Sequence, residues 1–262
     1  MTAPVNQNTA PRLPRPPVHT PDWTPEQIAA FWDNYGSIPH FRQRFFSLSW
    51  GIGILAIAEK FMPRDGVILD YGCGRGDLMQ PMIDGGHRVM GCDASPDSVR
   101  TVAERFAGKP NFLGAFVPSD AARPADADVV TLVEVIEHLP PPAVPGLLAA
   151  LAAHLKPGGH VIITCPHKEN LQAAEVLCPE CACRFHPVQH LQSLTPADVA
   201  AVAEAAGFRT VFARATRLRR KGEGALLSAL IAAGARLVAL APHLVYVGQK
   251  PPASLHASPP RP

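Results

Sequence analysis

The sequence predicts an α/β fold, in which helices cover a doubly wound, mostly parallel sheet. Two observations carry this prediction. Short apolar segments alternate with helical segments over residues 67–249, as in βαβ units joined by right-handed crossovers. The first apolar segment also ends in the glycine-spaced turn Asp70-Tyr71-Gly72-Cys73-Gly74-Arg75-Gly76-Asp77. A strand, a glycine-rich turn and a helix together form the nucleotide-binding corner of such a sheet.

The first elements are expected to be two helical segments. Thr24-Pro25-Glu26-Gln27 has the cap, the first-turn proline and the capping-box glutamine of a helix start. A second helical segment is expected over residues 45–61. Together they form an N-terminal helical cover, which either packs on the sheet or acts as a lid over cofactor and acceptor.

The sheet is expected to follow this cover. Strands are expected at 67–71, 87–92, 112–117, 129–133, 161–164, 208–215 and 244–247. Helical segments are expected at 78–83, from Ser95-Pro96 onward, at 147–155 and at 195–207. The segment 129–133 is apolar apart from Thr131, as suits a strand covered on both faces. Residues 156–159, Lys-Pro-Gly-Gly, indicate a turn.

Composition sets the domain organisation and excludes some functions. The 262 residues, 47% of them hydrophobic, suit one domain with an ample core. We expect Pro-rich tails at 1–21 and 251–262 and a catalytic domain at 22–250 with a Cys/His loop at 166–194. A net charge of +2 makes a nucleic-acid partner unexpected. With no apparent signal peptide or membrane span, a cytoplasmic location is expected.

The charges around the glycine turn indicate which cofactor binds. Asp70 precedes the turn and Asp77 follows it, and two carboxylates oppose a phosphate but suit a cation. S-adenosylmethionine (SAM), with its sulfonium and ammonium groups, fits. Asp93 lies 23 residues after Asp70 at the end of the second expected strand, where an acidic residue accepts hydrogen bonds from ribose hydroxyls. Ser95 is better placed than Asp93 to cap the next helix.

Residues 66–165 resemble the class I SAM-dependent methyltransferases. The matching motifs are DYGCGRGD (70–77), GCDAS (91–95), ADVVTLVEVIEHL (127–139) and LKPGGHVIIT (155–164). The resemblance implies a seven-stranded, Rossmann-like sheet whose last strand is antiparallel, with SAM above the strand ends. The cofactor-binding residues it implies are Asp70, Gly72, Gly74 and Gly76 at the turn, Asp93 at the ribose, Asp120 at the adenine and Glu134 on the opposite side.

Methyl transfer from SAM needs positioning above all, and a base only where the acceptor carries a proton. The candidate catalytic residues are Glu134, Glu137, His138 and His190. In small-RNA 3′-end 2′-O-methyltransferases, a similar Glu-x-x-Glu-His pattern joins a later histidine on a divalent metal, and His190 would be that histidine. Little basic surface accompanies the pattern here. We therefore favour a small-molecule, glycan or lipid-linked acceptor, methylated at oxygen.

Three alternatives stay open. One is the metal-dependent RNA 3′-end 2′-O-methyltransferase. The second is a non-catalytic SAM-binding or zinc-stapled interaction module, against which the intact glycine turn, Asp93 and the Glu-x-x-Glu-His pattern argue. In the third, His138 merely caps and packs.

The loop at 166–194 carries a potential metal site. Cys178, Cys181, His186 and His190 have the spacing C-x2-C-x4-H-x3-H, and four such ligands suit tetrahedral zinc. Cys183 is a spare thiol. The alternatives are a metal-free thiol cluster, or a catalytic role for His190. Cys73, Cys92 and Cys165 are expected to be small core residues.

A basic segment, residues 214–221, precedes an apolar segment at 225–240. Such a pair can dock on anionic lipid or bind a phosphorylated acceptor. Peripheral membrane contact through 214–240 is therefore a hypothesis. A solvated loop and a core-packed helix are the favoured interpretation.

Overall fold

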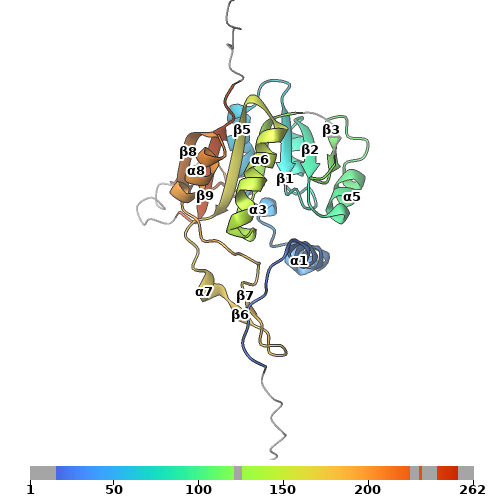
Figure 1. Cartoon of the computed structure of the whole chain (residues 1–262). Coiled ribbons are helices and arrows are strands. Elements are labelled where there is room, and N and C mark those ends of the chain that lie inside the picture. Colours follow the sequence, from blue (N-terminus) through green and yellow to red (C-terminus); the bar gives the residue numbers. More distant parts are fainter. Residues whose placement is uncertain (1–15, 121–125, 225–229, 232–240, 253–262) are drawn as a thin grey trace, which may run out of the picture.

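The computed structural model describes residues 16–120, 126–224, 230–231 and 241–252. Its main sheet has seven strands in the order β3-β2-β1-β4-β5-β9-β8 (Figure 1). The strands are β1 (Val67–Tyr71), β2 (Arg88–Cys92), β3 (Phe112–Phe116), β4 (Ala127–Val133), β5 (Leu155–Pro166), β8 (Arg209–Thr216) and β9 (His243–Gln249). β9 is antiparallel to both of its neighbours, β5 and β8, and the pairs among β1 to β5 are parallel. The predicted Rossmann-like sheet with an antiparallel last strand is confirmed.

Helices cover both faces of this sheet. The elements are α1 (Pro25–Ser37), α2 (Pro39–Arg42), α3 (Phe46–Ala58), η1 (Glu59–Phe61), α4 (Met79–Asp84), α5 (Pro96–Arg105), η2 (Ile136–His138), η3 (Pro141–Ala143), α6 (Val144–His154), α7 (Leu171–Ala174) and α8 (Pro196–Ala205). One core cluster joins α6 and α8 to one face through Leu148 and Val199. The other joins α3, α4 and α5 to the opposite face through Ile54, Met79 and Val102.

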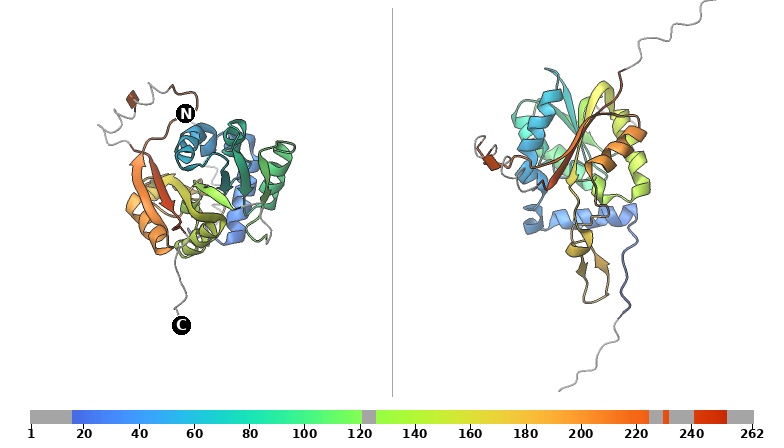
Figure 2. Two further views of the ribbon diagram at one scale, coloured as in Figure 1. Left: turned by 90° about the horizontal axis from the view of Figure 1, so that it is seen from above. Right: turned by 90° about the vertical axis from the view of Figure 1, so that its left-hand side faces the viewer.

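The helix α1 lies across one end of the sheet, as the right-hand view of Figure 2 shows in blue. Its start is the predicted capping box, because Thr24 and Gln27 bond reciprocally through side chain and backbone. The helix exposes most of its residues to solvent and buries only Tyr35 and Gly36. Its position at the sheet end, over the site described below, fits a cover.

The predicted turn at residues 156–159 is wrong in part. These residues belong to the long strand β5, although Gly158 has a φ of 81°, and the pairing with β4 shifts register between Ala127 and Val129. Backbone bonds from Gly158 to Lys250 and from Lys250 to Gly159 join this stretch to the residue that follows β9. Backbone pairing therefore makes a sequence that is typical of a turn part of the strand.

A long segment, residues 167–194, connects β5 to α8; we call it the strap. It contains α7 and a small hairpin of β6 (Val176–Leu177) and β7 (Arg184–Phe185), which projects from the body of the protein in Figure 1. Its ends are held together by a bridge between His167 and Leu194. The strap therefore leaves the sheet and returns to it at one place.

The predicted N-terminal tail differs in part from the structure. Residues 1–15 and 253–262 lie outside the described residues, but His19, inside the expected tail, forms a bridge with Cys183 of the strap.

In the basic segment, Arg217 makes two bonds to the Glu223 carboxylate, at 2.9 and 3.0 Å, so this arginine belongs to an internal ion pair. Residues 225–229 and 232–240 lie outside the described part. No helix within the described ranges is long and apolar enough to cross a membrane.

Candidate active site

A pocket of about 950 Å³ opens at the carboxyl ends of the central strands. One wall comes from Asp70 near the end of β1, from Gly72 and Gly74 in the loop that follows, and from Asp93 after β2. Glu134, His138 and His190 line it from the end of β4 and from the strap. A third group of lining residues is aromatic and comes from the N-terminal helices: Trp32, Tyr35, Phe45, Phe46 and Trp50. Ligand pockets span about 300–1,000 Å³, and this one lies at the upper end of that range.

The three glycines of the loop have different roles. Each has a positive φ, between 51° and 79°, which favours glycine. A Cβ on Gly72 would lie 2.6 Å from Val135, and one on Gly76 would lie 2.6 Å from Phe106, so both glycines permit close packing. A Cβ on Gly74 would have no described atom within 4 Å. Gly74 therefore presents bare backbone to the pocket, whereas Gly76, predicted to bind cofactor, is not among the described lining residues.

Asp93 is held by two backbone donors. Its Oδ2 accepts the N–H of Gly74 at 2.8 Å, and its Oδ1 accepts the N–H of Ser95 at 2.9 Å. Burial raises the pKa of Asp93, and these two bonds oppose that rise. Each carboxylate oxygen has two lone pairs, so one on each oxygen is left for a ligand. This geometry suits a pair of ribose hydroxyls, as the sequence predicts.

The two carboxylates that flank the glycine loop differ in environment. Asp70 is 3% exposed and accepts a hydrogen bond from the Thr131 hydroxyl at 2.9 Å. Burial raises the pKa of Asp70 to about 7, which the Thr131 bond opposes. Asp77 instead pairs with Arg105 at 2.8 Å. Arg105 therefore neutralises the charge of Asp77, whereas Asp70 becomes available to a cationic ligand as it ionises.

The predicted adenine contact at Asp120 is not supported by the described pocket. The carboxylate of Asp120 accepts the backbone N–H of Val117 at 3.1 Å, closing its own turn. Pro118, from the same turn, lines the pocket where Asp120 does not. Short-range turn bonding by aspartate accounts for this placement.

The end of β4 places two glutamates beside the pocket, the half-buried Glu134 and the buried Glu137. Glu134 has a φ of 53°, an uncommon conformation for a residue other than glycine. Its Oε1 accepts the Thr164 hydroxyl at 3.0 Å, and burial raises the pKa of Glu134 to about 8. Glu137 is 1% exposed, and neither of its carboxylate oxygens has a hydrogen-bond partner among the described residues. Burial raises the pKa of Glu137 as well.

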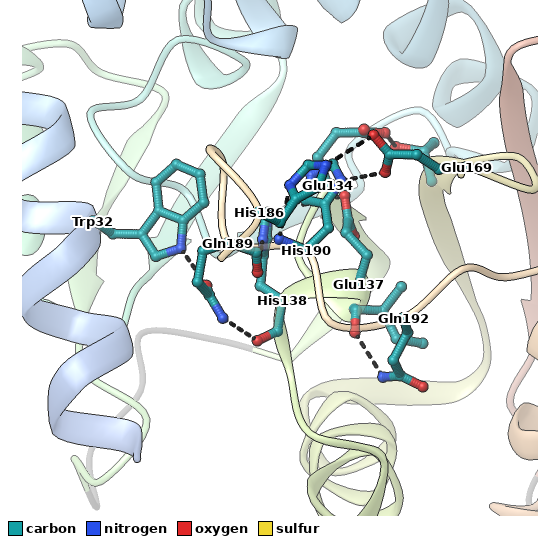
Figure 3. Close-up of polar contacts among 11 residues, drawn as sticks. Trp32, Glu134, Glu137, His138, Glu169, His186, Gln189, His190 and Gln192 are labelled. Carbon is teal, nitrogen blue, oxygen red and sulfur yellow. Dashed lines mark hydrogen bonds and ion pairs between the residues drawn. The ribbon is translucent and has the colours of Figure 1, made fainter. Parts of the chain in front are cut away.

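His138 is positioned by the strap. Its Nδ1 lies 3.3 Å from the carbonyl of Gln189, and a carbonyl only accepts, so Nδ1 carries the proton and Nε2 has the lone pair. Burial lowers the pKa of His138 to about 3, which keeps the ring neutral. The Gln189 amide returns a bond to the His138 carbonyl at 2.8 Å and accepts one from Trp32 Nε1 at 3.0 Å (Figure 3).

The histidines of the strap join carboxylates and not the cysteines. Two trios have ligand atoms within 4.8 Å of one another, Glu137-His138-His190 and Glu169-His186-His190. Within the described ranges, Cys178 and Cys181 belong to neither trio; they lie at the β6–β7 turn, where Cys181 is exposed. The predicted zinc set of Cys178, Cys181, His186 and His190 is therefore not brought together. Glu169, which sequence reasoning missed, takes the place of the thiols. Cys73, Cys92 and Cys165 are buried, as predicted.

The fold and pocket together define a class of protein. An open, mostly parallel sheet carries a glycine loop after its first strand and an acidic residue at the end of its second, around a pocket at the carboxyl ends of the strands. This is the arrangement of a nucleotide-cofactor enzyme.

Comparison with known proteins identifies the family. Residues 40–212 match the family described as "Methyltransferase domain". The chain belongs to this family, and its fold and motifs are those of a class I SAM-dependent methyltransferase.

The curated relatives share part of this chain. An O-methyltransferase of ubiquinone biosynthesis from Cupriavidus pinatubonensis is 34% identical over 48% of this chain and 49% of its own length. The corresponding protein from Thiobacillus denitrificans is 32% identical over 55% of this chain and 64% of its own length. The chain thus matches about half to two thirds of these two relatives.

Two solved structures share the fold over most of the chain. The 1,6-didemethyltoxoflavin N1-methyltransferase of Burkholderia thailandensis, solved with that compound and S-adenosylhomocysteine, has a TM-score of 0.58 and 21% identity, covering 90% of this chain and 94% of its own. An S-adenosylmethionine-dependent methyltransferase of Clostridium acetobutylicum has a TM-score of 0.58 and 13% identity, covering 85% and 98%.

Proposed function

We propose that this protein transfers the methyl group of SAM to an oxygen of a small aromatic acceptor. The observation that carries the proposal is the composition of the pocket. It combines the glycine loop and Asp93 with aromatic side chains from the N-terminal helical cover and with His138 and His190. Aromatic side chains suit a flat, apolar acceptor. The names of the relatives, O-methyltransferases of ubiquinone biosynthesis, support methylation at oxygen.

On the donor side, Gly72 and Gly74 allow the backbone to approach the methionine end of SAM, and Asp70 supplies a carboxylate there. Asp93 accepts the ribose hydroxyls through its two free lone pairs. These contacts fix the sulfonium methyl in one place. An acceptor oxygen aligned with the S–CH₃ bond then displaces a neutral thioether, a step that positioning accelerates strongly.

On the acceptor side, a hydroxyl must lose its proton as the new C–O bond forms. The imidazoles of His138 and His190 both line the pocket, and Nε2 of His138 lies 3.9 Å from a carboxylate oxygen of Glu137. Because burial lowers the pKa of His138 to about 3, this residue accepts a hydrogen bond better than it holds a proton. We therefore assign His138 to orienting the acceptor hydroxyl, and the candidate proton acceptor is His190.

The test has two independent stages. Calorimetry with S-adenosylhomocysteine measures the donor site alone, and wild-type protein is expected to bind it. Incubation with SAM and a panel of phenols, catechol among them, is then expected to yield methyl ethers by mass spectrometry. Binding without turnover on any phenol, glycan or lipid-linked acceptor would favour the non-catalytic module. Absence of binding would contradict the enzyme proposal altogether.

A second candidate is the metal-dependent RNA 3′-end 2′-O-methyltransferase. The observation in its favour is the trio Glu137-His138-His190, whose ligand atoms lie within 4.8 Å of one another next to the pocket. Two histidines and a carboxylate suit a divalent metal with an open position. Methylation of small RNA that EDTA abolishes and Mn²⁺ restores would support this candidate, whereas EDTA-insensitive methylation of phenols would exclude it. A glycan or lipid-linked acceptor, lipid contact through 214–240 and a cytoplasmic location stay predictions.

A further inference from the structure

The strap brings Glu169 and His190, 21 positions apart, into direct contact. The bridge between His167 and Leu194, and the bond from Lys168 N–H to the Leu194 carbonyl at 3.1 Å, close the base of the strap. The closed base therefore brings Glu169, near the start of the strap, next to His190, near its end. One carboxylate oxygen of Glu169 bonds to Nδ1 of His190, and the other lies 3.4 Å from Nε2 of His186 (Figure 3).

This contact decides which nitrogen of His190 bears the proton. A carboxylate accepts, so Nδ1 of His190 donates and its lone pair is at Nε2. With Nδ1 directed to Glu169, Nε2 is the nitrogen left for the pocket, which His190 lines beside His138. The rings of His138 and His190 have centroids 4.9 Å apart.

The ring of His186 packs against the ring of His190. The two imidazoles stack at 4.5 Å between centroids with 13° between their planes. His186 is 6% exposed, and its Nε2 is without a hydrogen-bond partner among the described residues, although Glu169 lies next to it. The His190 ring is thus fixed in its plane by His186 and in its tautomer by Glu169.

From this geometry we infer that Glu169 is a positioning residue, which holds His190 in the Nδ1–H tautomer so that Nε2 presents a lone pair to the acceptor hydroxyl. The inference rests on the proposed methylation of a protonated oxygen. A carboxylate paired with the far nitrogen of a histidine is a common way to orient that histidine toward a substrate or a metal. Glu169 itself does not line the pocket within the described residues.

The tautomer can be read directly by NMR. In full-length ¹⁵N-labelled protein with S-adenosylhomocysteine, long-range ¹H–¹⁵N spectra are expected to show His190 with Nδ1 protonated and Nε2 bare. Glu169→Gln, whose amide can turn either its oxygen or its NH₂ to the ring, is expected to mix or reverse the tautomers. Glu169→Asp keeps a carboxylate and is expected to retain the wild-type pattern in part.

Kinetics give the second readout. With the phenol that wild type methylates, Glu169→Gln is expected to lower kcat by about 10–100-fold, with a smaller change in the acceptor KM and no change in S-adenosylhomocysteine affinity. Glu169→Asp should recover part of the loss. Glu59→Gln is the matched control, because Glu59 also pairs with a histidine, His87 at 3.2 Å, away from the pocket. It should leave both readouts unchanged.

The outcomes separate this inference from the proposed function. A wild-type His190 with its proton on Nε2 would overturn the inference, as would Glu169→Gln with wild-type kcat. Equal losses of kcat and of thermal stability in the Gln and Asp variants, with an unchanged tautomer, would assign Glu169 a structural role only and would also overturn it. If wild type methylates no acceptor, the proposed function fails, and the role in methylation inferred for Glu169 fails with it, even where the tautomer spectra match.

Discussion

The indole Nε1 of Trp32 donates a hydrogen bond to the side-chain oxygen of Gln189 at 3.0 Å, joining α1 to the strap. Gln189 is completely buried and has a φ of 55°, a conformation that costs a residue other than glycine about 1–3 kcal/mol. Its amide and its carbonyl both bond to His138. On the same helix, Asp33 accepts the Ser95 hydroxyl at 2.7 Å, next to Asp93. The cover therefore contacts both the donor side and the acceptor side of the pocket.

The first prediction concerns this contact. Trp32→Phe keeps an aromatic ring but leaves the buried Gln189 oxygen without its donor, which should cost about 1–2 kcal/mol in the free energy of unfolding. The acceptor KM should rise, while the affinity for S-adenosylhomocysteine stays within twofold. Urea unfolding, steady-state kinetics and calorimetry measure the three quantities. Trp23→Phe is the control, since Trp23 packs edge-on against Phe31; equal effects of both changes would contradict the prediction.

The second prediction separates two aspartates that the sequence places in the cofactor site. Asp93→Asn removes the charge, and its amide NH₂ would face a backbone N–H, so S-adenosylhomocysteine affinity should fall by about 10–100-fold. Asp120→Asn should change that affinity less than twofold, because the Asp120 carboxylate serves its own turn. Calorimetry on both variants, with their melting temperatures as the check on folding, decides the matter. A large loss of S-adenosylhomocysteine affinity in Asp120→Asn would instead support the predicted adenine contact.

The third prediction concerns pH. The pKa of Asp70 is raised to about 7 by burial, from an ordinary value of 3.8. Between these values the folded protein holds a proton that the unfolded chain has lost, so this group makes stability fall as pH rises from about 4 to 7. Asp70→Asn should remove that slope, a gain of up to about 4 kcal/mol at pH 8 relative to wild type. Unfolding in urea at pH 5 and pH 8 measures it.

The same carboxylate should have the opposite effect on the cofactor. SAM is cationic at the sulfonium, and its affinity for wild type should strengthen as Asp70 ionises through about pH 7. Asp70→Asn should abolish this dependence. Asp84→Asn serves as the control, because Asp84 is exposed, accepts a bond from Gln80 at 2.9 Å and does not line the described pocket. If the free energy of unfolding of Asp70→Asn falls with pH as steeply as that of wild type, another group causes the slope and the prediction for Asp70 is wrong.

The sheet was predictable because each strand carries its own signal. The segment Ala127–Val133 is mostly apolar since both of its faces are covered, and Gly72 and Gly74 mark a loop whose positive φ angles favour glycine. The acceptor side carries no such local signal. Glu169 acts on His190 only because the strap closes at its base, and no spacing rule relates the two.

The predicted zinc set failed for the same reason. Spacing along the chain placed Cys178 and Cys181 with His186 and His190, but the hairpin turns the thiols away while the histidines remain at its base. Short loops were misread where backbone pairing or turn bonding decided the outcome, as at Gly158 and Asp120. Which distant side chains meet depends on the tertiary structure, and local sequence patterns do not reveal it.

The last prediction concerns Glu137, whose buried carboxylate lacks a hydrogen-bond partner among the described residues. Burying such a group costs free energy, and proteins retain groups of this kind at functional sites. In protein treated with EDTA at pH 8, Glu137→Gln should raise the free energy of unfolding by about 1–3 kcal/mol, because the amide carries no charge to bury and can donate to the neighbouring Glu134. For the metal-dependent candidate, the same change should also abolish methyl transfer, because Glu137 belongs to the trio with His138 and His190. Glu175→Gln, which removes the partner of Arg184 on the strap, should change stability by less than about 0.5 kcal/mol and leave turnover intact. Urea unfolding with a methylation assay tests both halves, and a Glu137→Gln protein that is less stable than wild type yet fully active would show that this carboxyl is part of the fold and not of the site.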